Sequence, residues 1–339
     1  MQIKRTSIKN IAEKLGVSNA TVSLVLSGKQ KEGRVSKALA EKIILTAKEM
    51  NYQPNSLARS LRVGSSQTIG LIVADISNLF FSTLAFYIQE EAEKYGYTVI
   101  ITNTNESVDK MGTMINMFRN RQVDGFLIVP TEHSEDHILG LVKDNFPLVL
   151  LDRYFPFIET SYVGIDNYKA SLEATKLLLD KKCKKIALLI YQNNLPHILE
   201  RRSGYVDAMA YAGMADNICI KEIRYSHIRS DIDNAINELF DNGSSVDGIF
   251  FATNSISMYA LKSIMRKGID ISTDVQVVCF DKNDAFDLMS IPIPYVLQPI
   301  AEIGKRAVEI LITEMSSKKR GQKETQSLKL QAVLHDGSS

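Results

Sequence analysis

The side chains best suited to binding a polyanion are concentrated in the first 62 residues. This segment holds 12 of the 40 Lys and Arg residues but only 4 of the 39 Asp and Glu residues. Its formal charge is therefore +8, whereas the rest of the chain carries −7. Neutralising a nucleic-acid backbone releases condensed counterions, so a compact basic segment favours a phosphate-bearing partner. We expect this segment to bind nucleic acid and the acidic remainder to have a different task.

The stretch Ile8–Leu26 has the spacing of two short helices joined by a tight turn. Gly16 permits the turn, and Ser18 can cap the second helix by accepting a backbone hydrogen bond. The apolar positions lie on one face of each helix, at Ile8, Ile11, Ala12 and Leu15 and then at Val22, Val25 and Leu26. An ordinary helical hairpin shares this pattern, but the spacing is typical of a DNA-reading helix-turn-helix.

If the second helix enters the major groove, its outward-facing N-terminal residues reach the base edges. Asn19 can pair bidentately with adenine, and Ala20 can pack on a thymine methyl group. The residues expected to contact bases are Asn19, Ala20, Ser23 and Leu24. The residues expected to contact phosphates are Ser7, Ser18, Thr21, Lys29 and Arg34.

From Thr68 onward, short apolar runs alternate with amphipathic stretches of helical length. The expected strands are Ile69–Val73, Thr98–Ile101, Phe126–Val129, Leu148–Leu151, Ile186–Ile190, Gly248–Ala252 and Val275–Phe280, with one more strand near the C-terminus. The expected helices are Phe80–Tyr95, Met111–Arg121, Tyr168–Lys181, Arg201–Tyr211, Asp231–Asp241, Ser255–Arg266 and Ala301–Met315. This alternation predicts an α/β body with two doubly wound parallel-sheet lobes, preceded by an all-α headpiece.

Polar residues follow many of these expected strands, at the sheet edge where ligands bind in open parallel sheets. They are Asp75, Asn78, Thr131, Asp152, Arg153, Tyr191, Gln192, Asn254 and Asp281. Carboxylates, amides and a guanidinium suit a sugar, because they form paired hydrogen bonds with vicinal hydroxyl groups. Aromatic residues that can support the sugar ring are Phe80, Phe81, Tyr154 and Phe155.

The sequence shows no sign of export or membrane insertion. The first residues, MQIKRTSIKN, contain no continuous apolar stretch, and no segment approaches the roughly 18 apolar residues of a membrane span. Cys183, Cys219 and Cys279 lie far apart in apolar surroundings, which favours reduced core thiols over a disulfide framework. We therefore expect a cytoplasmic protein.

Catalytic, cofactor and metal motifs are also missing from the sequence. The two glycines of Gly28–Val35 resemble those of a phosphate loop, but the lysine and hydroxyl of that motif are replaced by Arg34 and Val35. His133 and His137 are four residues apart and could share a metal on a helix, but a solvated helix start explains them better. We expect no catalysis, no cofactor and no metal.

Three motifs occur together in this chain: IKNIAEKLGVSNATVSLVLSGK, NYQPNSLARSL and TIGLIVADISNLFF. With them the chain resembles the lactose repressor/galactose repressor (LacI/GalR) family of bacterial transcription regulators, from Ser7 to about His335. The resemblance implies a periplasmic-sugar-binding-protein-like body and a homodimer on a pseudo-palindromic operator in double-stranded DNA. It also implies a small-molecule effector between the lobes.

By this resemblance, the segment Asn55–Arg62 is a hinge helix that contacts the operator centre. Asn55 would cap the helix, and Leu61 would wedge open a minor-groove base step beside Arg62. The alternative is that Leu61 merely packs under the body.

In the body, the motif LERRSGY matches Arg201 to the family's effector-binding arginine, or Arg202 if the register shifts by one. Asn254 and Asp281 match its cleft asparagine and aspartate. The ligand-binding residues expected from strand ends and resemblance together are Asp75, Asn78, Phe81, Asp152, Tyr191, Arg201, Asn254 and Asp281.

Two features depart from the family pattern. Leu24 stands where many members have an arginine that reads guanine, so the familiar half-site is not expected. The loop Gly28–Val35 is longer than usual and carries extra bases, which either add phosphate contacts or belong to a solvated loop.

The predicted domains are a headpiece at 1–54, a hinge helix and linker at 55–67, and an effector-binding and dimerisation body at 68–339. We expect lobe 1 to comprise about 68–163 and 293–318, and lobe 2 to comprise 164–292 and 319–339. The predicted function is a DNA-binding transcription regulator, a repressor, controlled by a sugar. The alternatives are a purine or nucleoside effector, a sugar-binding transport receptor, and an enzyme.

Overall fold

The computed structural model describes residues 6–31, 33–52, 64–241, 246–289, 291–316 and 324–337. The chain divides into two compact units, Met1–Ser66 and Gln67–Ser339, which we describe separately. The expected hinge helix, with Asn55, Leu61 and Arg62, lies outside the described residues.

The first unit contains three helices, α1 (Ile8–Leu15), α2 (Asn19–Leu26) and α3 (Lys37–Glu49). Each begins at a serine whose hydroxyl accepts a backbone hydrogen bond, namely Ser7, Ser18 and Ser36. Gly16 ends α1 at φ 66°, a left-handed backbone that glycine adopts without a steric penalty. The buried core is Ile11, Ala12, Val22, Val25, Ala40, Ile43 and Ala47. The helix-turn-helix geometry expected from Ile8–Leu26 is thus present.

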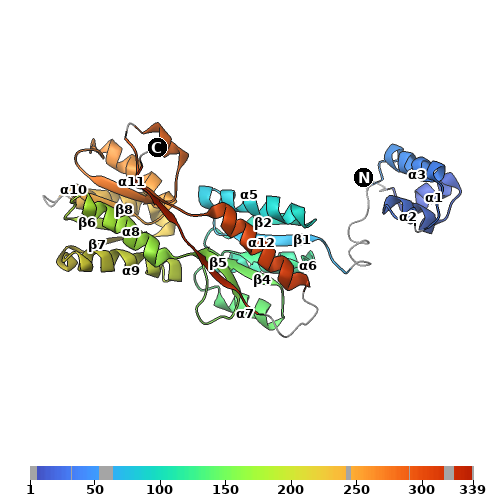
Figure 1. The fold of residues 1–339 in the computed structure, drawn as a ribbon, viewed down its shortest axis with the longest axis horizontal. Coiled ribbons are helices and arrows are strands. Elements are labelled where there is room, and N and C mark those ends of the chain that lie inside the picture. The colour runs from blue at the N-terminus through green and yellow to red at the C-terminus, as the bar shows by residue number, and fades with distance from the viewer. Residues whose placement is uncertain are drawn as a thin grey trace. The chain divides into compact units, whose positions relative to one another are not determined.

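The second unit contains two six-stranded sheets. Sheet A has the order β11-β5-β4-β3-β1-β2, and all of its neighbouring strands are parallel. Its strands are β1 (Thr68–Val73), β2 (Thr98–Asn103), β3 (Gly125–Ile128), β4 (Leu148–Leu151), β5 (Ser161–Ile165) and β11 (Ser327–Leu330). Its helices are α5 (Leu79–Lys94), α6 (Val108–Asn120), α7 (Glu135–Lys143) and α12 (Ile300–Ser316). We call this layered assembly lobe 1 (Figure 1).

Sheet B has the order β12-β10-β9-β8-β6-β7, and only the pairing of β12 with β10 is antiparallel. Its strands are β6 (Ile186–Tyr191), β7 (Cys219–Ile223), β8 (Gly248–Phe251), β9 (Gln276–Phe280), β10 (Tyr295–Leu297) and β12 (Val333–His335). Its helices are α8 (Asn167–Asp180), α9 (Pro196–Tyr211), α10 (Ile228–Asp241) and α11 (Asn254–Arg266), with short 3-10 turns at 215–217, 225–227 and 284–288. This is lobe 2. The predicted fold class, an α-helical headpiece with two parallel-sheet α/β lobes, is confirmed.

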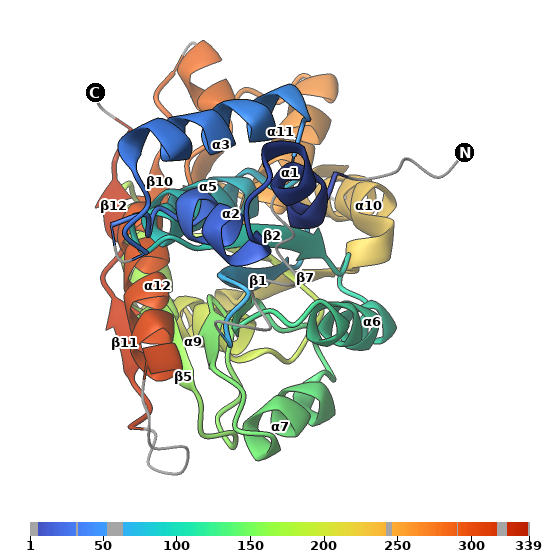
Figure 2. The same cartoon turned by 90° about the vertical axis from the view of Figure 1, so that its right-hand side faces the viewer.

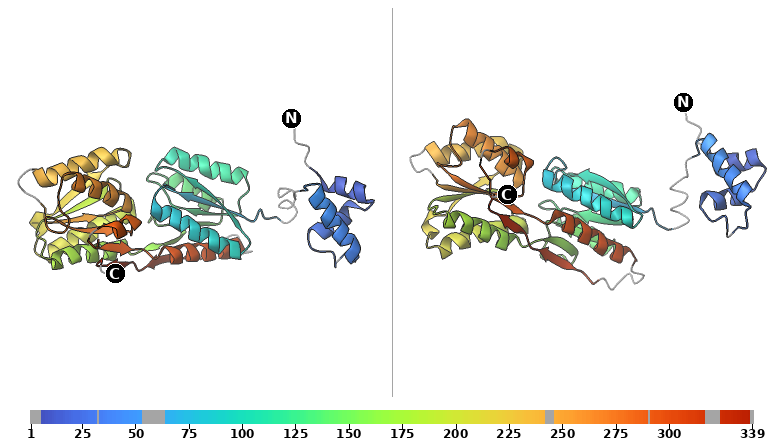
Figure 3. Two further views of the ribbon diagram at one scale, coloured as in Figure 1. Left: turned by 90° about the horizontal axis from the view of Figure 1, so that it is seen from above. Right: turned by 45° about the horizontal axis from the view of Figure 1, so that its top comes forward.

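The bounds of the lobes differ from those we expected. The chain leaves sheet A after Ile165, leaves sheet B after Leu297, and crosses again between Leu330 and β12. We expected crossings near Val163, Ile293 and Lys318. The third expectation was wrong because the C-terminal stretch forms two strands, one for each sheet, and a three-residue strand has no periodicity to detect. Figure 3 shows these strands running from lobe 1 into lobe 2.

Close packing between helices fixes the elements that carry the cleft residues. On α9, a Cβ at Gly204 would lie 2.4 Å from the carbonyl oxygen of Tyr168 on α8, so only glycine permits this approach. In lobe 1, α12 packs against α5 and against β3, β4 and β5 (Figure 2). Among the described residues, no helix is long and apolar enough to cross a membrane.

Candidate functional site

The exposed start of α2 is the first candidate site. Ser18, Asn19 and Ala20 are exposed there, while Val22 and Val25 point into the core. The Ser18 hydroxyl caps the helix by accepting from the Thr21 amide at 3.1 Å, and the two hydroxyls are 2.9 Å apart. Free amides and the dipole at a helix start attract anions. The expected DNA contacts at positions 18, 19, 20, 21 and 23 therefore lie together on the first two turns of α2.

The other residues expected to contact DNA in the headpiece differ in their exposure and position. Ser7 caps α1 in a reciprocal arrangement with Asn10, whose side-chain oxygen accepts from the Ser7 amide at 2.9 Å. Lys29 and Arg34 are exposed, on the loop after α2. Leu24 is half-buried, because its side chain lies against the backbone of Gly33.

The second candidate site is a narrow cavity between the two lobes of the body. All eight expected ligand-binding residues line it. Lobe 1 supplies Asp75, Asn78, Phe81 and Asp152, and lobe 2 supplies Tyr191, Arg201, Asn254 and Asp281. Phe80 and Arg153 also line it, whereas Thr131, Tyr154, Phe155 and Gln192 do not.

The two lobes present a carboxylate in the same way. Asp152 directly follows β4 and Asp281 directly follows β9, so each lies at the carboxyl end of its sheet. Both have a left-handed backbone, with φ of 60° and 70°, which is uncommon for residues other than glycine. The turn after each strand thus directs a short acidic side chain into the cavity.

In lobe 1, an ion pair fixes the guanidinium of Arg153. Its two terminal nitrogens donate to the two carboxylate oxygens of Glu106 at 2.7 Å each, and one of them also donates to the Pro130 carbonyl at 3.2 Å. A bidentate pair of this kind is both strong and directional. The remaining donor, Arg153 Nε, is buried and has no hydrogen-bond partner within the described residues, although it lies 3.7 Å from Asp152 Oδ2 in an ion pair.

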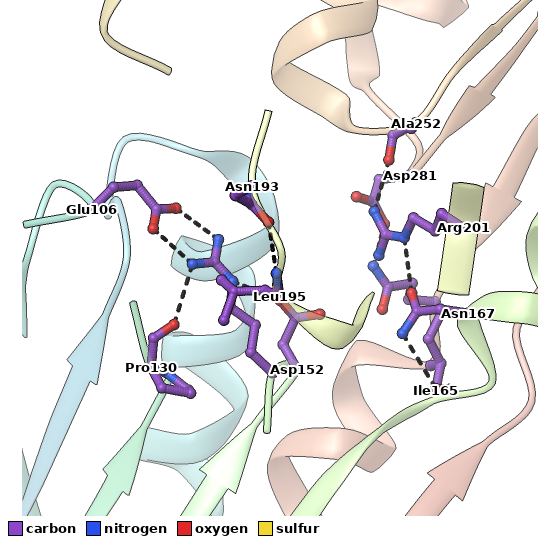
Figure 4. A network of polar contacts seen from close by, with 12 residues as sticks. Glu106, Pro130, Asp152, Ile165, Asn167, Asn193, Leu195, Arg201, Ala252 and Asp281 are labelled. Atoms are coloured by element: carbon purple, nitrogen blue, oxygen red, sulfur yellow. Dashed lines mark hydrogen bonds and ion pairs between the residues drawn. The ribbon is translucent and has the colours of Figure 1, made fainter. Parts of the chain in front are cut away.

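In lobe 2, Arg201 is only 3% exposed. Its Nε donates to Asn167 Oδ1 at 2.8 Å, one terminal nitrogen donates to the Ala252 carbonyl at 2.7 Å, and its Cζ lies 3.5 Å from the ring centre of Phe280. The nearby Asp281 accepts from the Gln298 amide at 2.8 Å. Asn167, Ala252 and Phe280 therefore hold Arg201 in one orientation, and Figure 4 shows the bonds to Asn167 and Ala252.

Burial shifts the ionisation of the cleft groups. It raises the pKa of Asp281 to about 6, although the charge of Arg201 and the hydrogen bond from Gln298 act in the opposite direction. It also raises the pKa of Asp152 despite the opposing charges of Arg153 and Arg201. Burial, reinforced by the same two arginines, lowers the pKa of His197 well below its usual value, which keeps this imidazole neutral.

The two lobes also touch one another at the cavity. The Tyr225 hydroxyl donates to Asp75 at 3.1 Å, and the Asn78 amide donates to the Ser255 hydroxyl at 3.2 Å. Asp75 and Asn78 thus hold the lobes together as well as lining the cavity.

Six other cavity residues were not predicted from the sequence. They are Glu106, His197, Tyr225, Thr253, Ser255 and Gln298. Glu106 and Gln298 follow β2 and β10, so the strand-end rule applies to them as well, but β10 was not predicted. His197 lies in the first turn of α9, which begins at Pro196 and not at Arg201 as expected; proline in the first helical turn was the available signal.

The structure distinguishes the two adjacent arginines that the sequence motif could have placed in the cavity. Arg201 lines the cavity, whereas Arg202 points to the outer surface and pairs with Glu222. Within the described residues, no group of three or more His, Cys, Asp or Glu side chains is placed to hold a metal ion.

Comparison with known proteins gives matches to both units. Residues 7–55 match the family of bacterial regulatory proteins of the lacI type, and residues 66–335 match the family of periplasmic binding proteins and sugar binding domains of the LacI family. The chain is 31% identical to the ribose operon repressor of Halalkalibacterium halodurans, over 92% of this chain and 91% of that protein. It is 30% identical to the transcriptional repressor PurR of Vibrio atlanticus, over 92% of each protein.

The fold is shared with solved structures. The structure of the regulator CelR with cellobiose superimposes with a TM-score of 0.69 at 23% identity, over 98% of both chains. Both of the relatives named above are transcriptional repressors and not enzymes. With matches to its helix-turn-helix unit and to its two-lobed unit, the chain belongs to the LacI family of bacterial DNA-binding transcription regulators.

Proposed function

We propose that this regulator is a repressor whose affinity for its operator is set by a neutral sugar bound between the lobes. The observation that carries the proposal is the cavity, in which Asp152 of lobe 1 faces Arg201 and Asp281 of lobe 2. A ligand that contacts both carboxylates joins the two lobes, so its binding energy acts directly on their closure. We propose all eight expected cavity residues as ligand contacts.

The charge of the cavity favours a neutral ligand. Four carboxylates, those of Asp75, Glu106, Asp152 and Asp281, line it together with two arginines. One arginine is neutralised by Glu106, so the remaining charge disfavours a phosphate group.

Buried polar atoms without a hydrogen bond favour hydroxyl groups on that ligand. Arg153 Nε is a donor, Gln298 Oε1 is an acceptor, and His197 Nδ1 is either one according to its tautomer. Buried polar atoms without partners are destabilising, and a sugar with several hydroxyls can satisfy donors and acceptors at once.

Effector binding would change the affinity for DNA by changing the relative position of the two lobes. Besides the two bonds at the cavity, Glu200 of lobe 2 accepts from Tyr154 at 2.9 Å and from Lys329 at 2.7 Å. These bonds and the three chain crossings restrict how the lobes move. A coupling free energy of about 1–3 kcal/mol between effector and operator corresponds to a 5- to 150-fold change in affinity.

We further propose a cytoplasmic homodimer on a pseudo-palindromic operator. Two α2 helices would enter successive major grooves about 10 base pairs apart, and the segments Asn55–Arg62 would wedge the centre with Leu61. Apolar side chains available for self-association include Phe86 on α5, which is 57% exposed, and Met265 on α11, which is 58% exposed.

A thermal-shift screen of the purified protein against sugars, sugar phosphates, nucleosides and nucleobases tests the effector class. A ligand at 100 times its Kd stabilises the folded state by about 2.7 kcal/mol. We expect a shift with a neutral sugar that is lost in Arg201→Ala and retained in Arg202→Ala. A shift with nucleosides and none with sugars would overturn the sugar assignment.

A further inference from the structure

Glu106 lines the cavity of the body, but its carboxylate already binds a side chain of its own lobe. It forms an ion pair with Arg153, and Figure 4 shows the two bonds at the Glu106 carboxylate. The pair belongs to the cavity wall and not to the core, because 23% of the Glu106 side chain and 8% of the Arg153 side chain are exposed. An ion pair in this position acts on the ligand as well as on the fold.

The path of the chain in lobe 1 brings Glu106 to Arg153. Glu106 follows β2 and Arg153 follows β4, and β1 and β3 lie between these strands in sheet A. Asn105 and Glu106 both have a left-handed backbone, at φ 50° and 57°, which residues other than glycine keep only where the surrounding structure holds them. The Asn105 amide donates to the Ala74 carbonyl at 2.8 Å, which ties this turn to the end of β1. The carboxylate therefore reaches Arg153 from a fixed position.

The Glu106 carboxylate occupies the position that an anionic ligand would take on Arg153. Each of its oxygens accepts from one terminal nitrogen at 2.7 Å. Arginine binds the carboxylates and phosphates of ligands in the same two-pronged way. Arg153 Nε, which has no hydrogen bond within the described residues, lies 3.7 Å from Asp152 Oδ2. An incoming anion would therefore have to displace Glu106 and approach Asp152.

The second arginine of the cavity is held in a different way. Arg201 donates to two neutral acceptors, Asn167 Oδ1 at 2.8 Å and the Ala252 carbonyl at 2.7 Å. Burial lowers the pKa of Arg201. Burial acts in the same direction on Arg153, but the charge of Glu106 and the hydrogen bonds to it outweigh burial, so the pKa of Arg153 is raised. Glu106 thus balances the charge of Arg153 in place.

We propose that Glu106 determines the charge class of the effector. Its carboxylate fills the anion position on Arg153, so the cavity admits neutral ligands and excludes those that would place a carboxylate or phosphate there. Glu106 acts through Arg153 and is a positioning and specificity-determining residue. The inference rests on the proposed effector site and names the residue on which its preference for neutral ligands depends.

Binding of formate to a full-length Glu106→Ala variant tests the proposal without knowledge of the effector. The substitution removes the carboxylate and leaves room for formate on the two terminal nitrogens of Arg153. Thermal unfolding is followed in sodium formate and in sodium chloride of equal ionic strength. In this variant we expect a saturable rise in Tm of about 3–5 °C at a tenfold excess of formate over its Kd. We expect no such rise in the wild-type protein, because Glu106 fills the position.

Three further variants locate the bound formate. Glu106→Ala/Arg153→Met should lose the effect, because the guanidinium is gone. Glu106→Gln should show no rise, because the amide keeps the volume of the native side chain and still occupies the position. Glu222→Ala is the surface control. Glu222 pairs with Arg202, and both side chains are more than a third exposed, so a hydrated guanidinium there should bind formate too weakly to raise the Tm.

Several outcomes would overturn the proposal. One is a formate effect that is equal in the wild-type protein and in Glu106→Ala, and another is a folded Glu106→Ala variant on which formate has no effect. If this variant does not fold in chloride, recovery of its native circular dichroism in formate gives the same comparison, and failure to recover it contradicts the proposal. A sugar phosphate that stabilises the wild-type protein but not Arg153→Met would also contradict it.

The same data distinguish this inference from the proposed function. A neutral sugar that stabilises the wild-type protein, together with no formate effect in Glu106→Ala, would remove the inference and leave the sugar site intact. The expected formate effect without stabilisation by any neutral sugar would remove the sugar assignment and leave Glu106 as the residue that occupies the anion position.

Discussion

The two binding regions of this chain differ in burial, because the face of α2 is exposed to solvent whereas the cleft of the body is buried. The face of α2 is exposed and adjoins a basic loop, so it meets a highly charged partner with little desolvation. The cleft of the body is buried, and its arginines are held by Glu106, Asn167 and a backbone carbonyl. The first region gains from long-range charge, whereas the second depends on exact hydrogen-bond geometry. Single mutations should therefore reduce DNA affinity by small steps in the headpiece, whereas a single mutation in the cleft should abolish effector binding.

The largest effect is expected for Arg201→Ala. The change leaves Asn167 Oδ1 and the Ala252 carbonyl without their charged donor in a buried site and removes a positive charge near Asp281, and each lost hydrogen bond to a charged group costs about 1.5–3 kcal/mol. Effector binding should also disappear. Calorimetric unfolding and titration with the effector measure the two consequences.

The matched control is Arg202→Ala on the same helix. Arg202 pairs with Glu222, and both side chains are more than a third exposed, so the change should alter stability by about 0–1 kcal/mol. Equal losses in both variants would contradict the contrast between cleft and surface.

A smaller but selective effect is expected for Leu61→Ala. If this leucine wedges the operator centre, its truncation lowers operator affinity at least tenfold, which is about 1.4 kcal/mol, and leaves effector binding unchanged. Titration of a selected operator duplex and of the effector gives both values. Unchanged operator affinity would remove the hinge segment from the DNA-binding account.

The ionisation of Asp281 predicts a pH dependence in the cleft. Its folded pKa of about 6 lies above the usual value, so the protein binds this proton more tightly when folded. The group consequently stabilises the unliganded fold most below about pH 4, and this contribution is lost as pH rises through about 6.

Effector binding should follow the opposite trend. A carboxylate accepts a sugar hydroxyl better than a carboxyl group does, so affinity should fall up to about tenfold per pH unit below 6. Effector titrations from pH 8 to pH 5 measure this, and Asp281→Asn should be weaker but nearly flat across the range. A flat profile in the wild-type protein would show that Asp281 does not accept from the ligand.

The smallest effect is expected for Tyr225→Phe. This change removes the bond from the Tyr225 hydroxyl to Asp75 that joins the lobes, a contribution of about 0.5–1.5 kcal/mol. Weaker effector binding with little change in unfolding temperature is expected. Tyr95→Phe, on the exposed end of α5, is the control, and equal effects of the two would argue against a role for the bond in lobe closure.

How well the sequence predicted each part depended on the length of the pattern behind it. The runs before Asp152 and Asp281 are buried parallel strands of four and five residues, so the rule that ligands bind at strand ends located both side chains. Arg201 lies on a helix, and only the resemblance to a family identified it.

Other parts left no periodic signal. β10 and β12 have three residues each, too few to show alternation, so Gln298 and the third lobe crossing could not be predicted. Glu106 and His197 reach the cavity through a turn and an early helix start, which depend on tertiary packing. Leu24 was correctly placed on the outward face of α2, but its contact with Gly33 depends on the path of a loop.

The central claim is that one cleft ligand controls DNA affinity, and one measurement tests it directly. An operator is first selected from random duplex DNA, and its Kd for the full-length protein is then measured with and without a saturating neutral sugar from the screen. We predict a 5- to 150-fold difference in the wild-type protein and none in Arg201→Ala. An operator Kd that the bound sugar leaves unchanged in the wild-type protein would contradict it.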